Sequence, residues 1–467
     1  MEKREGARAL PPGAHRSRGP VPGLAGQLYE AIAAAPCINS HSHLPQEVDR
    51  LADVPDALGF LGQHYPAADL YAAGMPETDI ELACGARFPE SLGEGESGAA
   101  GSASSVSAAG DRLPLLSRWK LVAPYWPYVR LTGYARSILI GFRDLLGFDD
   151  LSEETVGPIT HAVRDHSRPG YYSRILRERG NIRVSVAQMV DLVEVDRELF
   201  VPMPRLNRFS MIERRSQIDA IESDYGFRIR SLGDLMEGIR AVCERWSRAG
   251  VAGVKLSQSY FRRMDFHSRD RSDAEDVLKR ILRGEQVAVS SGAGRALGDY
   301  LVFACCRIAS ELDLTVQFHL GLRAGVRRSL EGCSPAPMAE LFAAFPEARF
   351  DLSHAGFPYL HESGVLAKAW RNVYLNMDWI QAVSPETSRR VLKEWLRMVP
   401  YNKLIAFGDD VTHVETAYGA LVLARENVAV VLAELIAEGT LTESQALDVA
   451  RAVFHDNPAR LYGIERT

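Results

Sequence analysis

The 467-residue sequence predicts an α/β protein built as a (β/α)₈ barrel, with a long, largely helical insertion after the first strand. Short runs rich in β-branched residues alternate with helical stretches, which is typical of parallel βαβ units. There are eight such runs, the number of parallel strands that closes a barrel of this kind. An open, doubly wound sheet is the alternative, but no Gly-x-Gly-x-x-Gly turn follows any of the runs.

The first structured element is expected to be a short helix over Leu24–Ala34 that leads into a strand at Cys37–Leu44. Residues 1–23 precede it and are rich in arginine, glycine and proline, so we expect a disordered N-terminal arm there. The barrel, with its insertion, is then expected to occupy residues 24–467.

The insertion is expected to cover residues 44–180, because the next recognisable strand begins only near Asn181. A helix near 111–148, rich in aromatic residues and arginines, is predicted within it. Residues 91–110 are a low-complexity stretch of glycine, serine and alanine. Such a stretch cannot bury enough apolar surface to offset its ordering entropy, so we expect a mobile loop.

The remaining strands and helices alternate from residue 181 onward. Strands are expected at Ile182–Met189, Arg208–Ile212, Val251–Leu256, Leu314–Leu320, Arg349–His354, Val373–Asp378 and Lys403–Asp410. Helices are expected at Leu232–Ala249, Ala296–Glu311, Met338–Phe345 and Glu386–Met398, followed by a C-terminal pair at Glu415–Glu438 and Thr442–Phe454.

The expected strands have one aliphatic face and one small or polar face. In the fifth strand, for example, Gln317 and His319 alternate with Val316 and Phe318. Strands buried on both faces are usually apolar throughout, so the polar face indicates a function inside the barrel. Its polar members lie toward the carboxyl ends of the strands, the end that carries the active site in barrels of this type.

The strand ends share a set of residues capable of metal and acid–base chemistry. The set is His41, His43, Lys255, His319, His354, Asp378 and Asp410. Four of the chain's twelve histidines are in it. His41 and His43 share one face of the first strand, because side chains two residues apart point the same way, and can therefore converge on one ion. His319 or His354 taken alone is more commonly a core histidine bonded to backbone, and the case rests on the whole set.

With these motifs the chain resembles the amidohydrolase superfamily of metal-dependent enzymes, and within it the amidohydrolase family 2 and uronate isomerase-like branch. The resemblance lies in Ile38–Glu47, Ala252–Phe266, Val316–Gly321, Asp351–Leu360, Lys403–Glu415 and the ending Asp456–Gly463. It covers most of residues 24–50 and 181–467 and is looser in the insertion.

The resemblance implies that His41, His43 and His319 are metal ligands. It implies that Asp410 is a ligand or the base that takes a proton from metal-bound water, and that His354 binds a second metal or polarises the substrate. Asp409 is the neighbouring alternative to Asp410, but strand parity places Asp409 on the helix-facing side.

Lys255 has several interpretations. In binuclear relatives a carboxylated lysine on this strand bridges two metals; otherwise Lys255 would pair with Asp378 or Asp410, or anchor a substrate carboxylate. We expect an unmodified, catalytic Lys255 and one divalent ion, Zn²⁺ first, with Mn²⁺ or Fe²⁺ as alternatives.

Two residues are predicted to bind the substrate. Arg323 follows the fifth strand closely and could clamp a carboxylate, and Tyr260 follows the fourth strand. Other arginines that could do so are Arg130, Arg136, Arg262 and Arg263. The aromatic cluster from Trp119 to Tyr128 is expected to pack the insertion on the barrel.

Composition excludes several classes of protein. The net charge of −6 provides no basic field for a nucleic acid. The six cysteines show no C-x-x-C spacing, and no stretch has the length and apolarity of a membrane span. The N-terminal residues lack the apolar core of a signal peptide, so we expect a cytoplasmic protein.

The sequence therefore predicts a metal-dependent hydrolase that cleaves a C–N or C–O bond of a small polar substrate. A carboxylate on that substrate is one group that the arginines could bind. A uronate isomerase-like or decarboxylase-like enzyme on the same metal site is the alternative. A catalytically silent barrel that acts as a binding module is a third hypothesis, and a homo-oligomer is expected only by analogy with other barrels.

Overall fold

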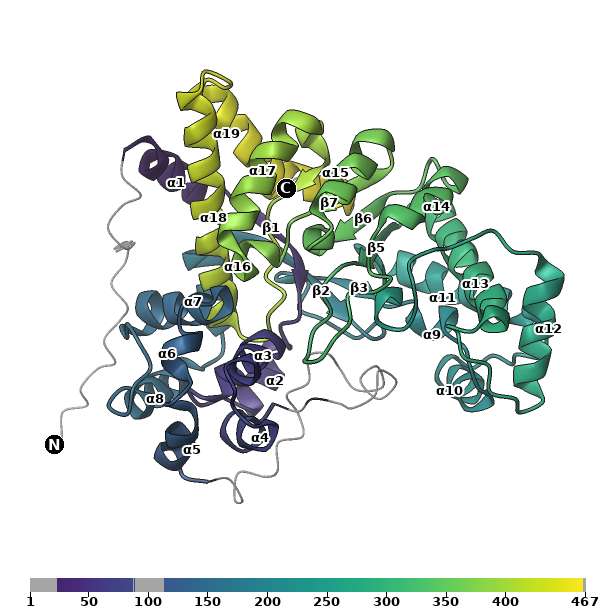
Figure 1. Ribbon diagram of the computed structural model, residues 1–467, viewed down its shortest axis with the longest axis horizontal. Helices are drawn as coiled ribbons and strands as arrows, with labels where there is room; N and C mark the ends of the chain where they lie inside the picture. The colour runs from purple at the N-terminus through teal and green to yellow at the C-terminus, as the bar shows by residue number, and fades with distance from the viewer. Residues whose placement is uncertain (1–22, 87, 89–112, 465–467) are drawn as a thin grey trace.

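The computed structural model describes residues 23–86, 88 and 113–464 (Figure 1). The predicted mobile loop at 91–110 lies outside these residues, and so does the predicted disordered arm at 1–23 except for Gly23.

Among the described residues, eight parallel strands form two sheets. The strands are β1 (Cys37–Ser42), β2 (Ile182–Met189), β3 (Phe200–Pro204), β4 (Gly253–Leu256), β5 (Thr315–His319), β6 (Phe350–Ser353), β7 (Val373–Asn376) and β8 (Leu404–Ile405). One sheet has the order β1-β2-β3 and the other the order β4-β5-β6-β7-β8. Every paired strand is parallel to its neighbour.

Hydrogen bonds join the two sheets at both junctions. Between β3 and β4, the Ala252 N–H donates to the Pro202 carbonyl at 2.8 Å. Between the residues after β8 and β1, the Ser40 N–H donates to the Phe407 carbonyl at 3.1 Å, and the Asp410 N–H donates to the His41 carbonyl at 3.1 Å. The predicted (β/α)₈ barrel is confirmed, with a thin hydrogen-bond ladder at these two junctions.

The expected third strand at Arg208–Ile212 is wrong. Asn207–Ser210 form the short helix α9, and β3 lies a few residues earlier, at Phe200–Pro204. The two prolines of that strand, Pro202 and Pro204, argue against a central strand in the sequence because proline cannot donate to a ladder. β3 tolerates them because Pro202, and by alternation Pro204, faces the thin junction with β4, where Pro202 takes part through its carbonyl alone.

The residues between β1 and β2 form helices that lie together on one side of the molecule (Figure 1). They are α2 (Glu47–Ala52), α3 (His64–Ala72), α4 (Glu77–Cys84), α5 (Leu115–Val122), α6 (Trp126–Val129), α7 (Gly133–Gly141) and α8 (Val156–His166). The single helix expected near 111–148 is therefore three helices. Pro124 and Pro127 lie where the first two separate, since proline interrupts a helix.

The remaining helices lie before, between and after the strands, and they include helices at Arg215–Tyr225, Arg271–Leu282 and Leu360–Ala369 that were not predicted. They are α1 (Leu24–Ala34), α10 (Arg215–Tyr225), α11 (Leu232–Arg248), α12 (Arg271–Leu282), α13 (Gly292–Glu311), α14 (Ala339–Ala344), α15 (Leu360–Ala369), α16 (Ile380–Val383), α17 (Pro385–Met398), α18 (Val414–Ala437), α19 (Glu443–Arg451) and α20 (Asn457–Leu461). Helix α18 packs closely on α7, because a Cβ at Gly419 would lie 1.9 Å from the Ser137 carbonyl oxygen.

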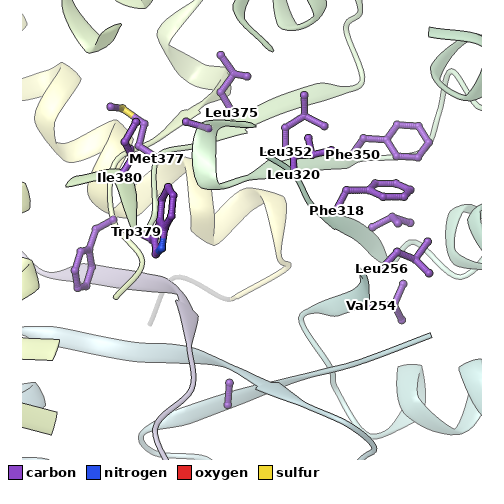
Figure 2. Packing of buried hydrophobic residues seen from close by; sticks show 14 of the residues in the cluster. Val254, Leu256, Phe318, Leu320, Phe350, Leu352, Leu375, Met377, Trp379 and Ile380 are labelled. Carbon is purple, nitrogen blue, oxygen red and sulfur yellow. The ribbon is translucent and has the colours of Figure 1, made fainter. Parts of the chain in front are cut away.

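Alternate residues of the strands build the apolar layer between the barrel and its helices. Figure 2 shows Val254 and Leu256 of β4 beside Phe318 of β5, and Phe350 and Leu352 of β6 next to them. The ring centroids of Phe318 and Phe350 are 6.2 Å apart. The intervening residues of these strands are polar and point into the barrel, where they make the site described below. None of the described helices combines the length and apolarity needed to cross a membrane.

Candidate metal centre

Three strand ends bring a group of potential metal ligands together. His41 lies on β1, His354 directly follows β6, and Asp410 lies beyond β8. One ligand atom from each lies within 4.8 Å of the others, and all three residues are buried. Asp410 Oδ1 is 3.2 Å from His41 Nε2 and also 3.2 Å from His43 Nε2.

Asp410 owes its place to a close approach by the backbone just before it. A Cβ at Gly408 would lie 2.5 Å from the Asp378 Cβ and 2.9 Å from the His41 Cβ, so only glycine lets the chain pass between these residues. Asp410 itself has a φ of 50°, in the left-handed region that aspartate tolerates better than most residues.

The neighbouring Asp409 has a different environment. Its Oδ2 accepts hydrogen bonds from Asn39 Nδ2 at 2.6 Å and from Ser42 Oγ at 3.1 Å, and its Oδ1 accepts one from the Val411 N–H at 3.1 Å. Its own N–H donates to Asn39 Oδ1 at 3.0 Å. Asp409 thus joins the end of the barrel to β1, while Asp410 faces the imidazoles.

His354 is oriented by a buried carboxylate. Asp378 Oδ1 accepts from the His354 backbone N–H at 2.8 Å and lies 3.1 Å from its Nδ1. His319 lies beside it, with ring centroids 4.3 Å apart, but its Nε2 is 3.1 Å from the Leu322 carbonyl oxygen. A ligand role for His319 therefore stays a prediction, and it would use the other ring nitrogen.

The electrostatics of the site favour neutral imidazoles beside an ionised carboxylate. Burial lowers the pKa of His41, and it lowers the pKa of His43 to about 3. Burial opposes ionisation of Asp410, but the His41 and His43 imidazoles beside it outweigh burial and hold the pKa of Asp410 well below its usual value. Burial also lowers the pKa of Lys255 to about 8.

These residues fit a divalent metal ion. His41 Nδ1 is 2.9 Å from Gln317 Oε1, a carbonyl oxygen that can only accept, so the proton of the neutral ring is on Nδ1. The Nε2 lone pair then faces the Asp410 carboxylate. Two acceptors at 3.2 Å repel one another unless a cation lies between them. Imidazole nitrogen and carboxylate oxygen are the ligands of zinc and related ions.

The other predicted site residues lie around this group. Lys255 Nζ donates to Gln317 Oε1 at 2.8 Å. The Tyr260 ring is 4.6 Å from that of His319, and its hydroxyl accepts from the Ala324 N–H at 3.0 Å. Arg323 is buried, and its Nη2 donates to the Glu331 carbonyl at 3.1 Å, so its guanidinium is engaged by a backbone loop.

Three further residues of the site were not singled out from the sequence. Arg205 follows β3 and its backbone forms a parallel β-bridge with that of Lys255. The positive charge of Arg205 contributes to lowering the pKa of His43. Arg205 was missed because that strand was placed elsewhere. Tyr134 of the insertion donates from its hydroxyl to the Asp410 carbonyl at 3.3 Å. Gln317 was visible on the polar face of its strand, but alternation alone does not reveal a hydrogen-bonding role.

Comparison with a family model places this site in context. Residues 234–464 match the model of the amidohydrolase family, which includes β4 to β8 and the C-terminal helices. Protein fluG of Emericella nidulans is 29% identical over 221 residues, which are 45% of this chain and 25% of that protein. The chain thus spans about a quarter of the length of this relative.

Solved structures share the fold over nearly the whole chain. A uronate isomerase from Thermotoga maritima superposes with a TM-score of 0.75 at 16% identity, covering 94% of this chain and 97% of that one. A glucuronate isomerase from Caulobacter crescentus gives a TM-score of 0.73 at 16% identity, covering 95% and 94%. At this level of identity the similarity concerns the fold, and it includes the helices between β1 and β2.

Proposed function

We propose that the chain, of which residues 234–464 match the amidohydrolase family, is a metal-dependent hydrolase that cleaves a C–N or C–O bond of a small polar substrate. The observation that carries the proposal is the ionised Asp410 beside neutral imidazoles at the carboxyl end of the barrel. His41, His43 and Asp410 would hold the ion, with His319 or His354 as further ligands. A divalent ion at this place supplies a Lewis acid that polarises a carbonyl oxygen and lowers the pKa of water.

Asp410 and His354 would handle protons in this reaction. Asp410 is ionised at neutral pH, so it can accept a proton from the attacking water and pass it to the leaving group. His354 Nδ1 faces Asp378, which would stabilise the ring if Nε2 took up a proton. A protonated His354 would then stabilise negative charge that develops on the substrate.

Positive charge near the site supports a substrate that carries a carboxylate. Arg205, directly after β3, forms a backbone β-bridge with Lys255 of β4, and its Nε, like that of Arg323, is buried without a hydrogen-bond partner among the described residues. An unpaired buried donor is costly unless a ligand satisfies it. We infer that Arg205 contacts the substrate, with the Tyr260 hydroxyl as a neighbouring contact. Arg323 remains the alternative clamp.

A turnover screen of carboxylate-bearing amides, lactones and uronates tests the proposal. The wild-type protein, loaded in turn with Zn²⁺, Mn²⁺ and Fe²⁺, should hydrolyse at least one amide or lactone. Asp410→Asn should reduce kcat by at least about 10²-fold, because general acid–base catalysis contributes about that much. Glu394→Gln, a change beside the exposed His361, is the control and should leave kcat unchanged.

The second candidate is an isomerase-like or decarboxylase-like activity at the same residues. The shared fold over nearly the whole chain, insertion included, with two uronate isomerases favours it. Turnover of a uronate without hydrolysis of any amide or lactone would replace the hydrolase proposal with this one. A protein that neither binds a metal nor turns over any compound would support a silent barrel.

A further inference from the structure

Gln317 occupies the centre of a buried polar network inside the barrel. Its Oε1 lies 2.9 Å from His41 Nδ1, 2.8 Å from Lys255 Nζ and 2.9 Å from Gln188 Nε2. Its Nε2 donates to Asp351 Oδ2 at 2.5 Å and lies 3.3 Å from the Tyr462 hydroxyl. The side chain therefore joins four strands, β1, β2, β4 and β6, to its own strand β5.

Elementary chemistry fixes which way this amide faces. The Lys255 ammonium can only donate, so the group toward it must be the carbonyl oxygen. The Asp351 carboxylate oxygen accepts from the Tyr462 hydroxyl at 2.6 Å, so the group on that side must be the NH₂. A flipped amide would set donor against donor on one side and acceptor against acceptor on the other. The orientation thus follows from the partners on both sides.

This orientation determines the state of His41. A neutral imidazole whose Nδ1 faces a carbonyl oxygen must carry its proton there, which leaves the Nε2 lone pair directed at Asp410. The same oxygen accepts from Lys255 and so holds that ammonium beside Gln317. An acceptor at this one position therefore orients a predicted ligand and a predicted catalytic residue together.

Residues at the other end of the barrel hold Gln317 in turn. Tyr462, which follows α20, donates to Asp351, and Asn376 Nδ2 lies 3.2 Å from the same hydroxyl. Gln317, Asp351 and Asn376 have no measurable solvent exposure, and Tyr462 is also buried. The C-terminal segment thereby connects to the metal ligands through two hydrogen bonds.

We propose that Gln317 is a positioning residue that fixes the Nδ1–H tautomer of His41 and holds Lys255, and that Asp351 and Tyr462 keep its amide in the required orientation. The part of this inference that concerns metal affinity rests on the proposed metal site. The tautomer of His41 can be measured without any metal.

Two variants separate positioning from simple packing. Gln317→Met keeps the length of the side chain and removes both polar groups. Gln317→Glu keeps an acceptor for His41 and Lys255 but places a second carboxylate beside Asp351. Gln381→Met is the control, because Gln381 is also fully buried and bonds only outside the predicted site residues, to the Ala406 carbonyl and Asn427.

The first measurement is affinity for Zn²⁺ and Co²⁺, by competition with a chromophoric chelator and by the Co²⁺ absorption spectrum. Gln317→Met should weaken binding about 10- to 100-fold, the usual effect of removing a group that orients a ligand. Gln317→Glu should remain within a few fold of wild type even though it is less stable to heat, and Gln381→Met should match wild type. A loss in Gln317→Glu equal to that in Gln317→Met would mean packing alone and would overturn the proposal.

The second measurement is the ¹⁵N spectrum of histidine-labelled, metal-free protein, with His41 assigned by its absence in His41→Asn. In wild type His41 should carry a proton on Nδ1, whether or not Nε2 is also protonated, and it should lose this preference in Gln317→Met; an unprotonated Nδ1 in wild type would overturn the proposal. A wild type with that tautomer but no metal affinity would instead sink the proposed function and the metal part of this inference, leaving the positioning of His41 supported.

Discussion

Asp409 and Asp410 are adjacent in the chain, but their side chains point to different surroundings and their pKa values differ as a result. Burial raises the pKa of Asp409 to about 8, whereas the pKa of Asp410 lies well below its usual value beside His41 and His43. Asp409→Asn should lower the free energy of unfolding by about 1–3 kcal/mol, because both carboxyl oxygens of Asp409 face hydrogen-bond donors and the new NH₂ group would meet one of them. Asp410→Asn should instead weaken metal binding with a smaller change in stability.

Chemical unfolding and metal titration of both variants check this contrast. Equal effects of the two substitutions on metal affinity would show that Asp409 is also a ligand. The variants are matched, since each replaces one carboxylate by its isosteric amide at adjacent positions.

His43 should make the metal-free protein sensitive to acid. Its pKa is about 3 in the folded state, against 6.5 for an ordinary histidine. Between these values the unfolded chain binds a proton that the folded chain does not, so the free energy of unfolding falls as the pH falls from 6.5 toward 3. His41 and Asp410, whose pKa values are also lowered, act in the same direction.

Removing His43 should therefore reduce this dependence. In His43→Asn the slope of the unfolding free energy against pH should be smaller by up to about 1.4 kcal/mol per pH unit, the value for one proton. Urea unfolding at several pH values between 7 and 5 measures it. His361→Asn, at an exposed position, is the control, and a slope in His43→Asn as steep as the control's would contradict the prediction.

Gly408 affects the placement of a whole segment, because it allows the residues after β8 to pack against β1 and complete the barrel. In Gly408→Ala the new Cβ would overlap Asp378 and His41, so one of these must move. We expect a loss of about 1–3 kcal/mol in stability, typical of overpacking, and weaker metal binding. Calorimetry and metal titration measure the two effects.

Gly157 in α8 provides the matched control, because a Cβ there would meet no atom within 4 Å. Gly157→Ala should change stability by no more than about 0.5 kcal/mol and leave metal binding unchanged, because Gly157 lies in the first turn of α8. Wild-type metal affinity in Gly408→Ala would show that the close approach is not what positions His41.

Strand elements were predictable where side-chain alternation was regular. The strands β4 to β7 fall inside their predicted ranges, because each shows a clear aliphatic face. β3 could not be predicted, since the prolines of Phe200–Pro204 resemble a loop and the run Arg208–Ile212 resembles a strand. Only the tertiary context, a junction with β4 that needs few hydrogen bonds, makes those prolines acceptable.

For the whole molecule, the fold and the cluster of His41, His354 and Asp410 could be predicted because strand ends of a barrel converge. The contributions of Arg205, Tyr134 and the Gln317 network could not. They depend on strand order, on how the insertion packs over the barrel and on which atoms of an amide face which partner. None of these leaves a periodic signal in the sequence.

The number of ions bound by the folded chain is the prediction that concerns the molecule as a whole. Lys255 Nζ donates to the Gln317 amide, and we expect an unmodified lysine and a single ion rather than a bridged pair. Elemental analysis should find one divalent ion per chain, and the intact mass should show no added carboxylate.

Chelation should lower the melting temperature, and one equivalent of ion should restore it, because a ligand at a hundred times its Kd stabilises by about 2.7 kcal/mol. His41→Ala should abolish that response. Two ions per chain that both disappear in Lys255→Met would show instead that the lysine bridges them.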